Sequence, residues 1–320
     1  MRKILVTGAS GQIGSELVTK LREVYGEMNV VATDIKRPKD GSEEILFEVL
    51  DVLDAERFYE TAKKYEVDTI MHLAGILSYH AEKDPQGAWQ LNMQGLINGL
   101  EVARNLNLQI FNPSSIGAFG PETPKDSTPQ TTIQRPKTMY GINKVAGELL
   151  CDYYFARFGV DTRGVRFPGI ISAKILPGGG TTDYAVEMYY GAIKKQNYCC
   201  YLEEGTYLDM MYLPDALQAI IDLMEANPDK LIHRNAYNIT AVSAAPEDFA
   251  KAIQTYIPEF TISYEVDPIR QKIADSWPNS LDPTEAMEQW NFTYEYDLDR
   301  MTKDMLEKLR VKLREGVSRG

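Results

Sequence analysis

Short apolar runs alternate with longer amphipathic segments through the first half of the chain. The runs are rich in β-branched residues and predict strands at 3–7, 29–33, 45–49, 69–75, 109–112 and 161–166. The segments between them have apolar residues at helical spacing and predict helices at 55–65, 85–105 and 140–158. Strands alternating with helices of this length are typical of a parallel sheet covered on both faces, which binds ligands at the carboxyl ends of its strands.

The pattern changes after the last of these strands. A glycine run at 177–182 precedes a helical segment, and further elements are predicted at 214–226, 236–240, 246 onward, 261–265 and 299–314. We therefore expect an α/β protein, a Rossmann-type doubly wound parallel sheet with a smaller C-terminal α/β substrate lid. The expected boundaries are 1–168 with about 208–242 for the first domain, and 169–207 with 243–320 for the lid.

A glycine-rich turn directly follows the first predicted strand. Gly8, Gly11 and Gly14 are spaced by two residues each, and the third opens a helical pattern. A strand, a tight turn and a helix start present backbone N–H groups and a positive dipole end to a pyrophosphate. The context is the one that the motif requires, so the turn, with Gln12 and Ile13 inside it, is a candidate dinucleotide site.

The ends of the next strands supply further candidates. Asp34 ends the second strand, where a carboxylate accepts hydrogen bonds from a ribose diol and repels a 2′-phosphate, which favours NAD over NADP. Lys36 and Arg37 follow closely and weaken that preference. The remaining residues expected near the cofactor are Asp51, Val52, Leu73, Ala74, Gly75, Asn92 and Ile170.

A tyrosine and a lysine four residues apart begin the helix at 140–158. The spacing puts Tyr140 and Lys144 on one helical face. A free tyrosine has a pKa near ~10, and one ammonium about 4 Å away contributes roughly 4 kcal/mol toward ionising a phenol at an effective dielectric of about 20. The pair can therefore form a base.

The spacing alone is not specific. Tyr59 with Lys63, Tyr79 with Lys83 and Tyr190 with Lys194 repeat it, and we interpret these as ordinary helix-surface pairs, with Tyr79 the closest to a strand end. Only Tyr140 follows a pair of hydroxyls, Ser114 and Ser115, at the end of an apolar strand.

Composition narrows the class of function. The chain has 320 residues and a net charge of -12, which disfavours a nucleic-acid partner. Three cysteines cannot build a disulfide framework, and three scattered histidines give no metal site. We expect a cytoplasmic protein without a signal peptide or membrane span.

Together these motifs resemble the extended short-chain dehydrogenase/reductase superfamily. Within it, the segments 177–185 and 271–278 are similar to those of the short-chain L-threonine 3-dehydrogenase family. The resemblance implies that NAD takes hydride from a substrate alcohol while Tyr140 removes its proton, that Lys144 assists, and that a serine orients the alcohol. Ser115 matches the catalytic serine by its offset from Phe119, but Ser114 and Ser115 could exchange roles.

The resemblance also implies a substrate and an assembly. L-Threonine would be oxidised at its β-hydroxyl to 2-amino-3-oxobutanoate, and the residues expected to contact it are Ser78, Ser114, Tyr140, Gly180, Thr181, Thr182 and Trp277. The alternatives are a plain surface loop for the glycine run and a core position for Trp277. A homodimer through the helices at 85–105 and 140–158 is expected by the same analogy.

Two other functions are compatible with the motifs. Nucleotide-sugar epimerases and dehydratases share the cofactor and the Ser, Tyr and Lys residues, but they have an arginine where this chain has Leu208 and dehydratases have an acid pair where it has Ile116 and Gly117. A buried diphosphate without its cation is costly, which argues against a nucleotide sugar. A non-catalytic NAD sensor would be expected to lack Tyr140 or Lys144.

Overall fold

Six short strands, buried on both faces, form the largest sheet. The structure, a computed structural model, describes residues 1–37, 46–174 and 180–317, and within them every pairing of this sheet is parallel. The strands in spatial order are β3 (Phe47–Val49), β2 (Val30–Asp34), β1 (Ile4–Thr7), β4 (Thr69–His72), β5 (Gln109–Phe111) and β7 (Asp161–Arg163). This order reverses at β1, as in dinucleotide-binding sheets. The predicted Rossmann-type fold class is confirmed; residue 45 of the predicted third strand lies outside the described residues.

Alternate residues of each strand point to opposite faces of this sheet. Leu5 and Ile70 pack in one cluster with helices α2 (Ala55–Lys64), α5 (Gly95–Leu106) and α6 (Met139–Phe158). Val6 and Met71 pack in another with α1 (Gln12–Tyr25) and α8 (Leu213–Glu225). Because both faces are covered there, the central strands β1 and β2 have nearly continuous apolar runs rather than alternating polar residues.

One predicted strand is broken where the chain leaves the large sheet, and the predicted strand 109–112 is followed by a short strand of a different sheet. The run 161–166 divides at Gly164 into β7 and β8 (Val165–Phe167), and β8 pairs with β6 (Ser114–Ser115) and β12 (Tyr237–Asn238) in a separate sheet. A Cβ atom at Gly164 would lie 2.2 Å from the carbonyl oxygen of Asn112. Glycine at 164 therefore permits the two segments to pass close to each other. Pro113, which has no N–H, separates β5 from β6.

The long helix predicted at 85–105 is also interrupted. It consists of α4 (Pro85–Trp89), a π-helical turn at Gln90–Gln94 and α5. A π turn adds a residue to the helical turn and changes the direction of the side chains that it carries. Asn92 lies inside this turn.

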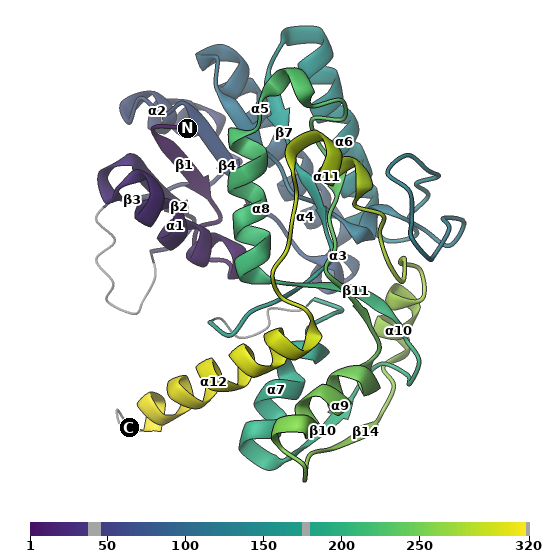
Figure 1. Ribbon diagram of the computed structural model, residues 1–320. Coiled ribbons are helices and arrows are strands. Elements are labelled where there is room, and N and C mark those ends of the chain that lie inside the picture. The colour runs from purple at the N-terminus through teal and green to yellow at the C-terminus, as the bar shows by residue number, and fades with distance from the viewer. Residues whose placement is uncertain (38–45, 175–179, 318–320) are drawn as a thin grey trace.

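Segments from the second half of the chain form a smaller α/β unit below the large sheet (Figure 1). The elements of this unit, the lid, are β9 (Gly169–Ile171), α7 (Tyr184–Lys195), β10 (Asn197–Cys200), β11 (Leu208–Tyr212), β13 (Val242–Ala244), α9 (Pro246–Tyr256), β14 (Thr261–Tyr264), α10 (Pro268–Ala274) and α12 (Leu298–Val317). Helix α12 packs beside α7 and α9. The apolar side chains of these three helices share one cluster with those of the small sheets of the lid.

Two elements differ from the predicted domain boundaries. Helix α11 (Thr284–Trp290), predicted in the lid, packs Trp290 against Tyr237 in the cluster of the large sheet. Strand β11 contributes Met210 to the lid cluster and Met211 to the cluster of the large sheet. The lid is therefore attached along β11 and α11 as well as where the chain passes between the two domains.

A buried ion pair fastens helix α6 to the small sheet of β6, β8 and β12. The Arg166 guanidinium donates to both carboxylate oxygens of Glu148, with Nε at 3.0 Å and Nη2 at 2.9 Å. Each side chain is 7 % exposed. Ser114 Oγ and Gln134 Nε2 also donate to this carboxylate, so its acceptor positions are filled, as a buried charge requires.

Removing the carboxylate should destabilise the fold strongly. In Glu148→Ala, Arg166 remains buried without its anion, and we expect the free energy of unfolding to fall by about 3–5 kcal/mol. Equilibrium unfolding in urea measures this loss. Glu295→Ala, which breaks an exposed pair with Arg300, is the matched control and should change stability little. Equal losses in the two variants would contradict the role given to the buried pair.

Candidate active site

One cavity opens at the carboxyl ends of β1 and β4, between the large sheet and the lid. It extends from the glycine turn after β1 to residues 180–183 and Trp277 of the lid. The predicted site residues that line it are Gly8, Gly11, Gln12, Ile13, Gly14, Leu73, Ala74, Gly75, Ser78, Asn92, Ser114, Ser115, Tyr140, Lys144, Ile170, Gly180, Thr181, Thr182 and Trp277.

The glycine turn after β1 leaves no space for side chains. Gly8 has φ +66°, and a Cβ atom there would lie 2.7 Å from the backbone nitrogen of Ala74. A Cβ atom at Gly14 would lie 2.2 Å from the carbonyl oxygen of Gly8. Helix α1 begins at this turn with Gly11 as its N-cap and no side-chain cap. Its first N–H groups can therefore donate to a pyrophosphate, which fits the predicted dinucleotide.

Three of the predicted cofactor residues lie outside the cavity lining. The Asp34 carboxylate, at the end of β2, accepts hydrogen bonds from the backbone N–H groups of Ser10 and Ile35 at 3.0 and 2.8 Å. The Asp51 side chain accepts from the N–H of Leu53 at 2.9 Å, and Val52 is buried in the core. Asp34 is thus held beside the glycine turn, where a bound ribose would lie.

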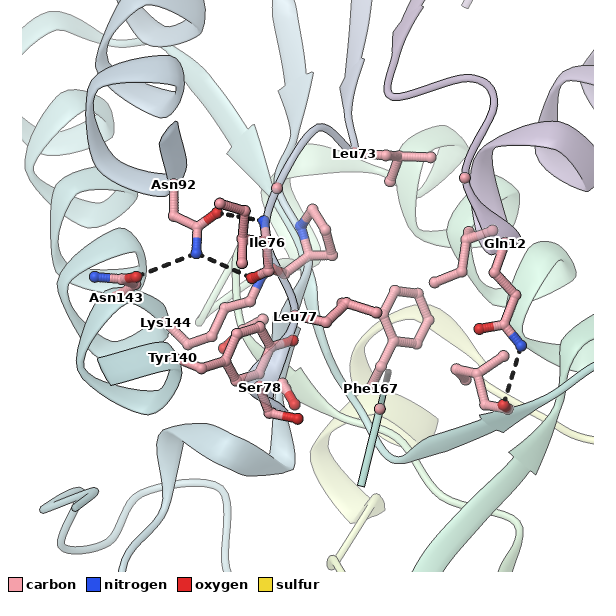
Figure 2. Close-up of a pocket in the computed structure, with 18 of the residues that line it drawn as sticks. Gln12, Leu73, Ile76, Leu77, Ser78, Asn92, Tyr140, Asn143, Lys144 and Phe167 are labelled. Atoms are coloured by element: carbon pink, nitrogen blue, oxygen red, sulfur yellow. Dashed lines mark hydrogen bonds between the residues drawn. The ribbon is translucent and has the colours of Figure 1, made fainter. Parts of the chain in front are cut away.

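Asn92 holds the wall of the cavity that follows β4. Its amide accepts from the N–H of Ile76 at 2.7 Å and donates to the carbonyl of the same residue at 3.1 Å, and it also donates to Asn143 at 3.1 Å (Figure 2). The π-helical turn brings this amide to the loop. Asn92 therefore shapes the cavity through the backbone at 76, a function that the sequence pattern did not indicate.

Gln12 and Ile170 meet on the opposite side of the cavity. The Gln12 amide donates to the carbonyl of Ile170 at 3.5 Å (Figure 2), which joins helix α1 to β9. The two residues come from the two halves of the chain, so this contact helps to fix the width of the cavity.

The helix that carries Tyr140 begins at a side-chain cap. Thr138 Oγ1 accepts from the N–H of Gly141 at 3.1 Å and starts α6 one residue before the tyrosine. Lys144 Nζ lies 5.3 Å from the centroid of the Tyr140 ring and donates to the carbonyl of Pro113 at 2.6 Å. The strand end thus holds the ammonium next to the phenol in the cavity (Figure 2).

The other three Tyr-x-x-x-Lys pairs have similar local geometry. Their lysine nitrogens lie 5.7, 4.3 and 5.4 Å from the tyrosine ring centroids at Tyr59, Tyr79 and Tyr190. None of these three tyrosines is among the residues that line the cavity. Position at the strand ends, and not the contact itself, distinguishes Tyr140.

Two glycines allow the Tyr140 ring to pack against the loop after β6. A Cβ atom at Gly117 would lie 3.1 Å from the ring, and one at Gly141 would lie 2.2 Å from the carbonyl oxygen of Gly117. Larger side chains would push the helix start away from the loop. Gly117, which stands where dehydratases have an acid, therefore has a steric function here.

The two serines of β6 point in different directions. Ser114 Oγ donates to the buried carboxylate of Glu148. Ser115 Oγ accepts from the N–H of Gly117 at 3.1 Å, which leaves its own O–H to donate elsewhere. A Cβ atom at Gly117 would touch both Ser115 Oγ and the Tyr140 ring, so Ser115 is the serine on the side of the tyrosine.

His72 lines the cavity as a neutral side chain. Burial, with a smaller contribution from Lys144, lowers the pKa of His72 to about 4. Its Nδ1 bonds to Thr7 Oγ1 at 3.2 Å, and its Nε2 is buried without a partner in the described part of the chain.

The lid supplies the other wall. Thr181 Oγ1 lies 3.4 Å from Ser78 Oγ on helix α3 (Ser78–Lys83), across the junction of the two halves. Trp277 is 5 % exposed, and its Nε1 has no partner among the described residues. Part of the predicted glycine run, 177–179, lies outside the described residues.

Asp183 was missed by the sequence analysis. It is 8 % exposed, accepts from the N–H of Gly180 at 2.7 Å and is the one carboxylate among the described residues that line the cavity. The signal was its position directly after Thr182 in the glycine-rich segment, but an aspartate before a helix is also an ordinary helix-start residue.

The described residues contain neither a metal site nor a membrane-spanning helix. In the described ranges, no three His, Cys, Asp or Glu side chains are grouped as a metal site requires. No helix in those ranges has both the length and the apolar character to cross a membrane.

Comparison with known proteins identifies the family. The model of the NAD dependent epimerase/dehydratase family matches residues 4–240. An uncharacterized epimerase/dehydratase of Staphylococcus aureus strain USA300 is 58% identical, with 98% of each chain covered. The structure of L-threonine dehydrogenase from Clostridium difficile is 63% identical, with TM-score 0.96 and 98% of each chain covered.

A GalE-like L-threonine dehydrogenase from Cupriavidus necator in its holo form is 47% identical, with TM-score 0.93, covering 96% of this chain and 99% of that one. These matches, with the glycine turn and the open start of α1, support NAD as the cofactor and an NAD-dependent oxidoreductase as the class. The chain belongs to the NAD-dependent epimerase/dehydratase family.

Proposed function

We propose that this protein oxidises the β-hydroxyl of L-threonine to 2-amino-3-oxobutanoate with NAD. The observation that carries the proposal is that Tyr140, Lys144 and Ser115 share one cavity with the hydroxyls of the lid and with Asp183. The similarity to L-threonine dehydrogenases over nearly the whole chain supports the same substrate.

Tyr140 acts as the general base in this proposal. The Lys144 ammonium, held by the Pro113 carbonyl, stabilises negative charge on the phenol oxygen. Ser115 donates its O–H to the substrate oxygen and orients it toward Tyr140. NAD, when bound, would supply the acceptor for the hydride of the carbinol carbon while the hydroxyl proton passes to Tyr140, so that the C–H and O–H bonds break and a C=O bond forms.

The two charged ends of a zwitterion have separate partners in the cavity. The hydroxyls of Ser78, Thr181 and Thr182 can donate to the substrate carboxylate. Asp183, as the carboxylate of the lining, is positioned to bind the substrate ammonium. This assignment supplies the ammonium partner that the sequence left open.

A nucleotide-sugar substrate fits the cavity less well. Epimerases of this family resemble the chain around β11 but have an arginine at the position of Leu208. The Leu208 side chain is fully buried in the lid core, so no cation at this position faces a diphosphate. The small substrate is therefore favoured over the nucleotide sugar.

A homodimer through α6 is part of the proposal. Ile142, Leu149 and Tyr153 are 42, 63 and 54% exposed, and spacings of seven and four residues put them on one helical face. Trp89 of α4, 47% exposed, adds to the exposed apolar surface. Such surfaces on soluble proteins commonly mark interfaces.

The substrate is tested by incubating the protein with NAD and L-threonine, D-threonine, L-serine or UDP-galactose. We expect reduced nicotinamide to accumulate with L-threonine, and product analysis to find UDP-galactose unchanged. Epimerisation of the sugar nucleotide without oxidation of L-threonine would overturn the proposal.

In the same assay Tyr140→Phe should lower kcat by about 10²-fold or more, because the base is lost.

The tyrosine variant has an internal control in the repeated motif. Tyr59→Phe removes the hydroxyl of another Tyr-x-x-x-Lys pair and should leave kcat unchanged. NAD affinity of Tyr140→Phe, measured by fluorescence titration, should stay within severalfold of the wild type because the pyrophosphate site is untouched. More than about a tenth of wild-type kcat in Tyr140→Phe would contradict the assignment of the base.

The ammonium site is tested by Asp183→Asn, which keeps an acceptor for the N–H of Gly180. We expect KM for L-threonine to rise roughly 10- to 100-fold, the loss of one charge-assisted contact of about 1.5–3 kcal/mol. Glu187→Gln, on the same helix but outside the lining, is the control. 3-Hydroxybutyrate, which lacks the ammonium, should react equally well with the wild type and Asp183→Asn; an equal loss with both substrates would indicate a purely structural function.

The dimer is tested by Leu149→Glu in sedimentation equilibrium. A charge in the apolar face should shift the protein from dimer to monomer, because an unpaired buried charge opposes association. Val311→Glu places the same charge on an exposed apolar position of α12 and should leave the dimer intact. A wild-type protein that sediments as a monomer at micromolar concentration would refute the interface.

A further inference from the structure

An arginine of the lid lies between two tyrosines at the edge of the cavity. Arg270, on α10, has its guanidinium carbon 4.1 Å from the ring centroid of Tyr201 and 4.8 Å from that of Tyr79. Tyr201 follows β10 in the lid, whereas Tyr79 belongs to α3 beside the large sheet. The stack therefore bridges the two halves of the molecule.

The two rings are the principal partners of this guanidinium. The Arg270 side chain is 19% exposed, and its ion pair with Asp267, one turn earlier, spans 3.8 Å. A planar guanidinium loses little hydration when it stacks, so aromatic faces can hold it where a carboxylate is distant. The orientation of Arg270 is thus set by stacking.

The stack is connected directly to the lid loop. Tyr201 Oη donates to the carbonyl of Thr181 at 3.3 Å, and Thr181 Oγ1 contacts Ser78 Oγ at 3.4 Å. Ser78 is the neighbour of Tyr79 on α3. One series of contacts therefore runs from Tyr79 through Arg270, Tyr201 and Thr181 to Ser78, and both of its ends lie on α3.

Helix α3 is itself attached to the start of the helix that carries the proposed base. Glu82 accepts a hydrogen bond from the N–H of Met139 at 2.7 Å, and Met139 precedes Tyr140. A displacement of α3 would therefore move both the lid loop at 180–182 and the start of α6.

We propose that Arg270 is a positioning residue that clasps the lid loop at 180–182 against α3 and so sets the affinity for the substrate. The inference rests on the proposed function in one respect, that the substrate carboxylate meets this loop. Arg270 itself does not line the cavity and takes no part in bond breaking.

The clasp, which is the stack of Arg270 on Tyr79 and Tyr201, requires aromatic rings and a planar cation. Simple packing requires only side chains of similar volume, so substitutions can distinguish the two. Tyr79→Phe keeps the ring and should behave as the wild type. Tyr79→Leu removes the ring and should raise KM for L-threonine about tenfold, with kcat changed less than about threefold, because the chemistry is untouched. Arg270→Lys keeps the charge but not the planar stack, and should resemble Tyr79→Leu.

A second measurement does not depend on the substrate. Hydrogen exchange of the ligand-free protein should be faster around 181–184 and 269–274 in Tyr79→Leu and Arg270→Lys than in Tyr79→Phe. The double variant Tyr79→Leu with Arg270→Lys should raise KM no more than the larger single effect, because both changes remove one stack.

Three outcomes would overturn the clasp: equal exchange in Tyr79→Leu and Tyr79→Phe, KM within twofold of the wild type in Tyr79→Leu, or multiplicative effects in the double variant. A protein that does not oxidise L-threonine would remove the proposed substrate, and the exchange comparison would still decide whether the clasp exists. The two proposals can therefore fail separately.

Discussion

The buried pair of Glu148 and Arg166 is the contact on which the geometry of the candidate site depends. Glu148 lies two helical turns after Tyr140 and one after Lys144, so all three side chains share a face of α6. The ion pair fixes that face against β8, and the same carboxylate holds Ser114. Two charges taken out of water are costly, and this cost is offset only when both are fully hydrogen-bonded. Once the pair forms, the rotation of α6 is set, and the tyrosine and lysine face the strand ends.

The charges that line the cavity are few, and their signs match a small zwitterion. Among its described residues Lys144 is a cation engaged with a backbone carbonyl, His72 is neutral because it is buried, and Asp183 is the carboxylate. A net charge of -12 disfavours the attraction of a polyanion. In the proposed function, each end of the substrate has its own local partner in the cavity, with hydroxyl donors for the carboxylate and Asp183 for the ammonium.

The sequence predicted the parts of the site that follow from local pattern. The strand, glycine turn and helix around Gly8, and the Tyr140 and Lys144 spacing, depend on neighbours within a few residues, and the structure brings them to one cavity. Contacts between distant segments were not predictable. The different directions of Ser114 and Ser115 depend on a carboxylate more than thirty residues later. The π turn around Asn92 and the break at Gly164 depend on the backbone segments that they contact. Helix α11 was assigned to the lid because no local pattern shows that Trp290 packs under the sheet.

The four Tyr-x-x-x-Lys pairs show why a motif needs a place in the fold before it has a function. In each pair the lysine nitrogen lies over or beside the ring at a similar distance, so the local electrostatic contact is the same. The difference arises from what else is present: at Tyr140 a strand end supplies a serine and a carbonyl, and a glycine loop brings the ring into the cavity. At Tyr79 the same motif lies one helix away, and its ring contacts the guanidinium of Arg270 as well as Lys83. Helical spacing therefore brings two side chains together, while the topology of the sheet decides whether the pair faces a substrate, another domain or solvent.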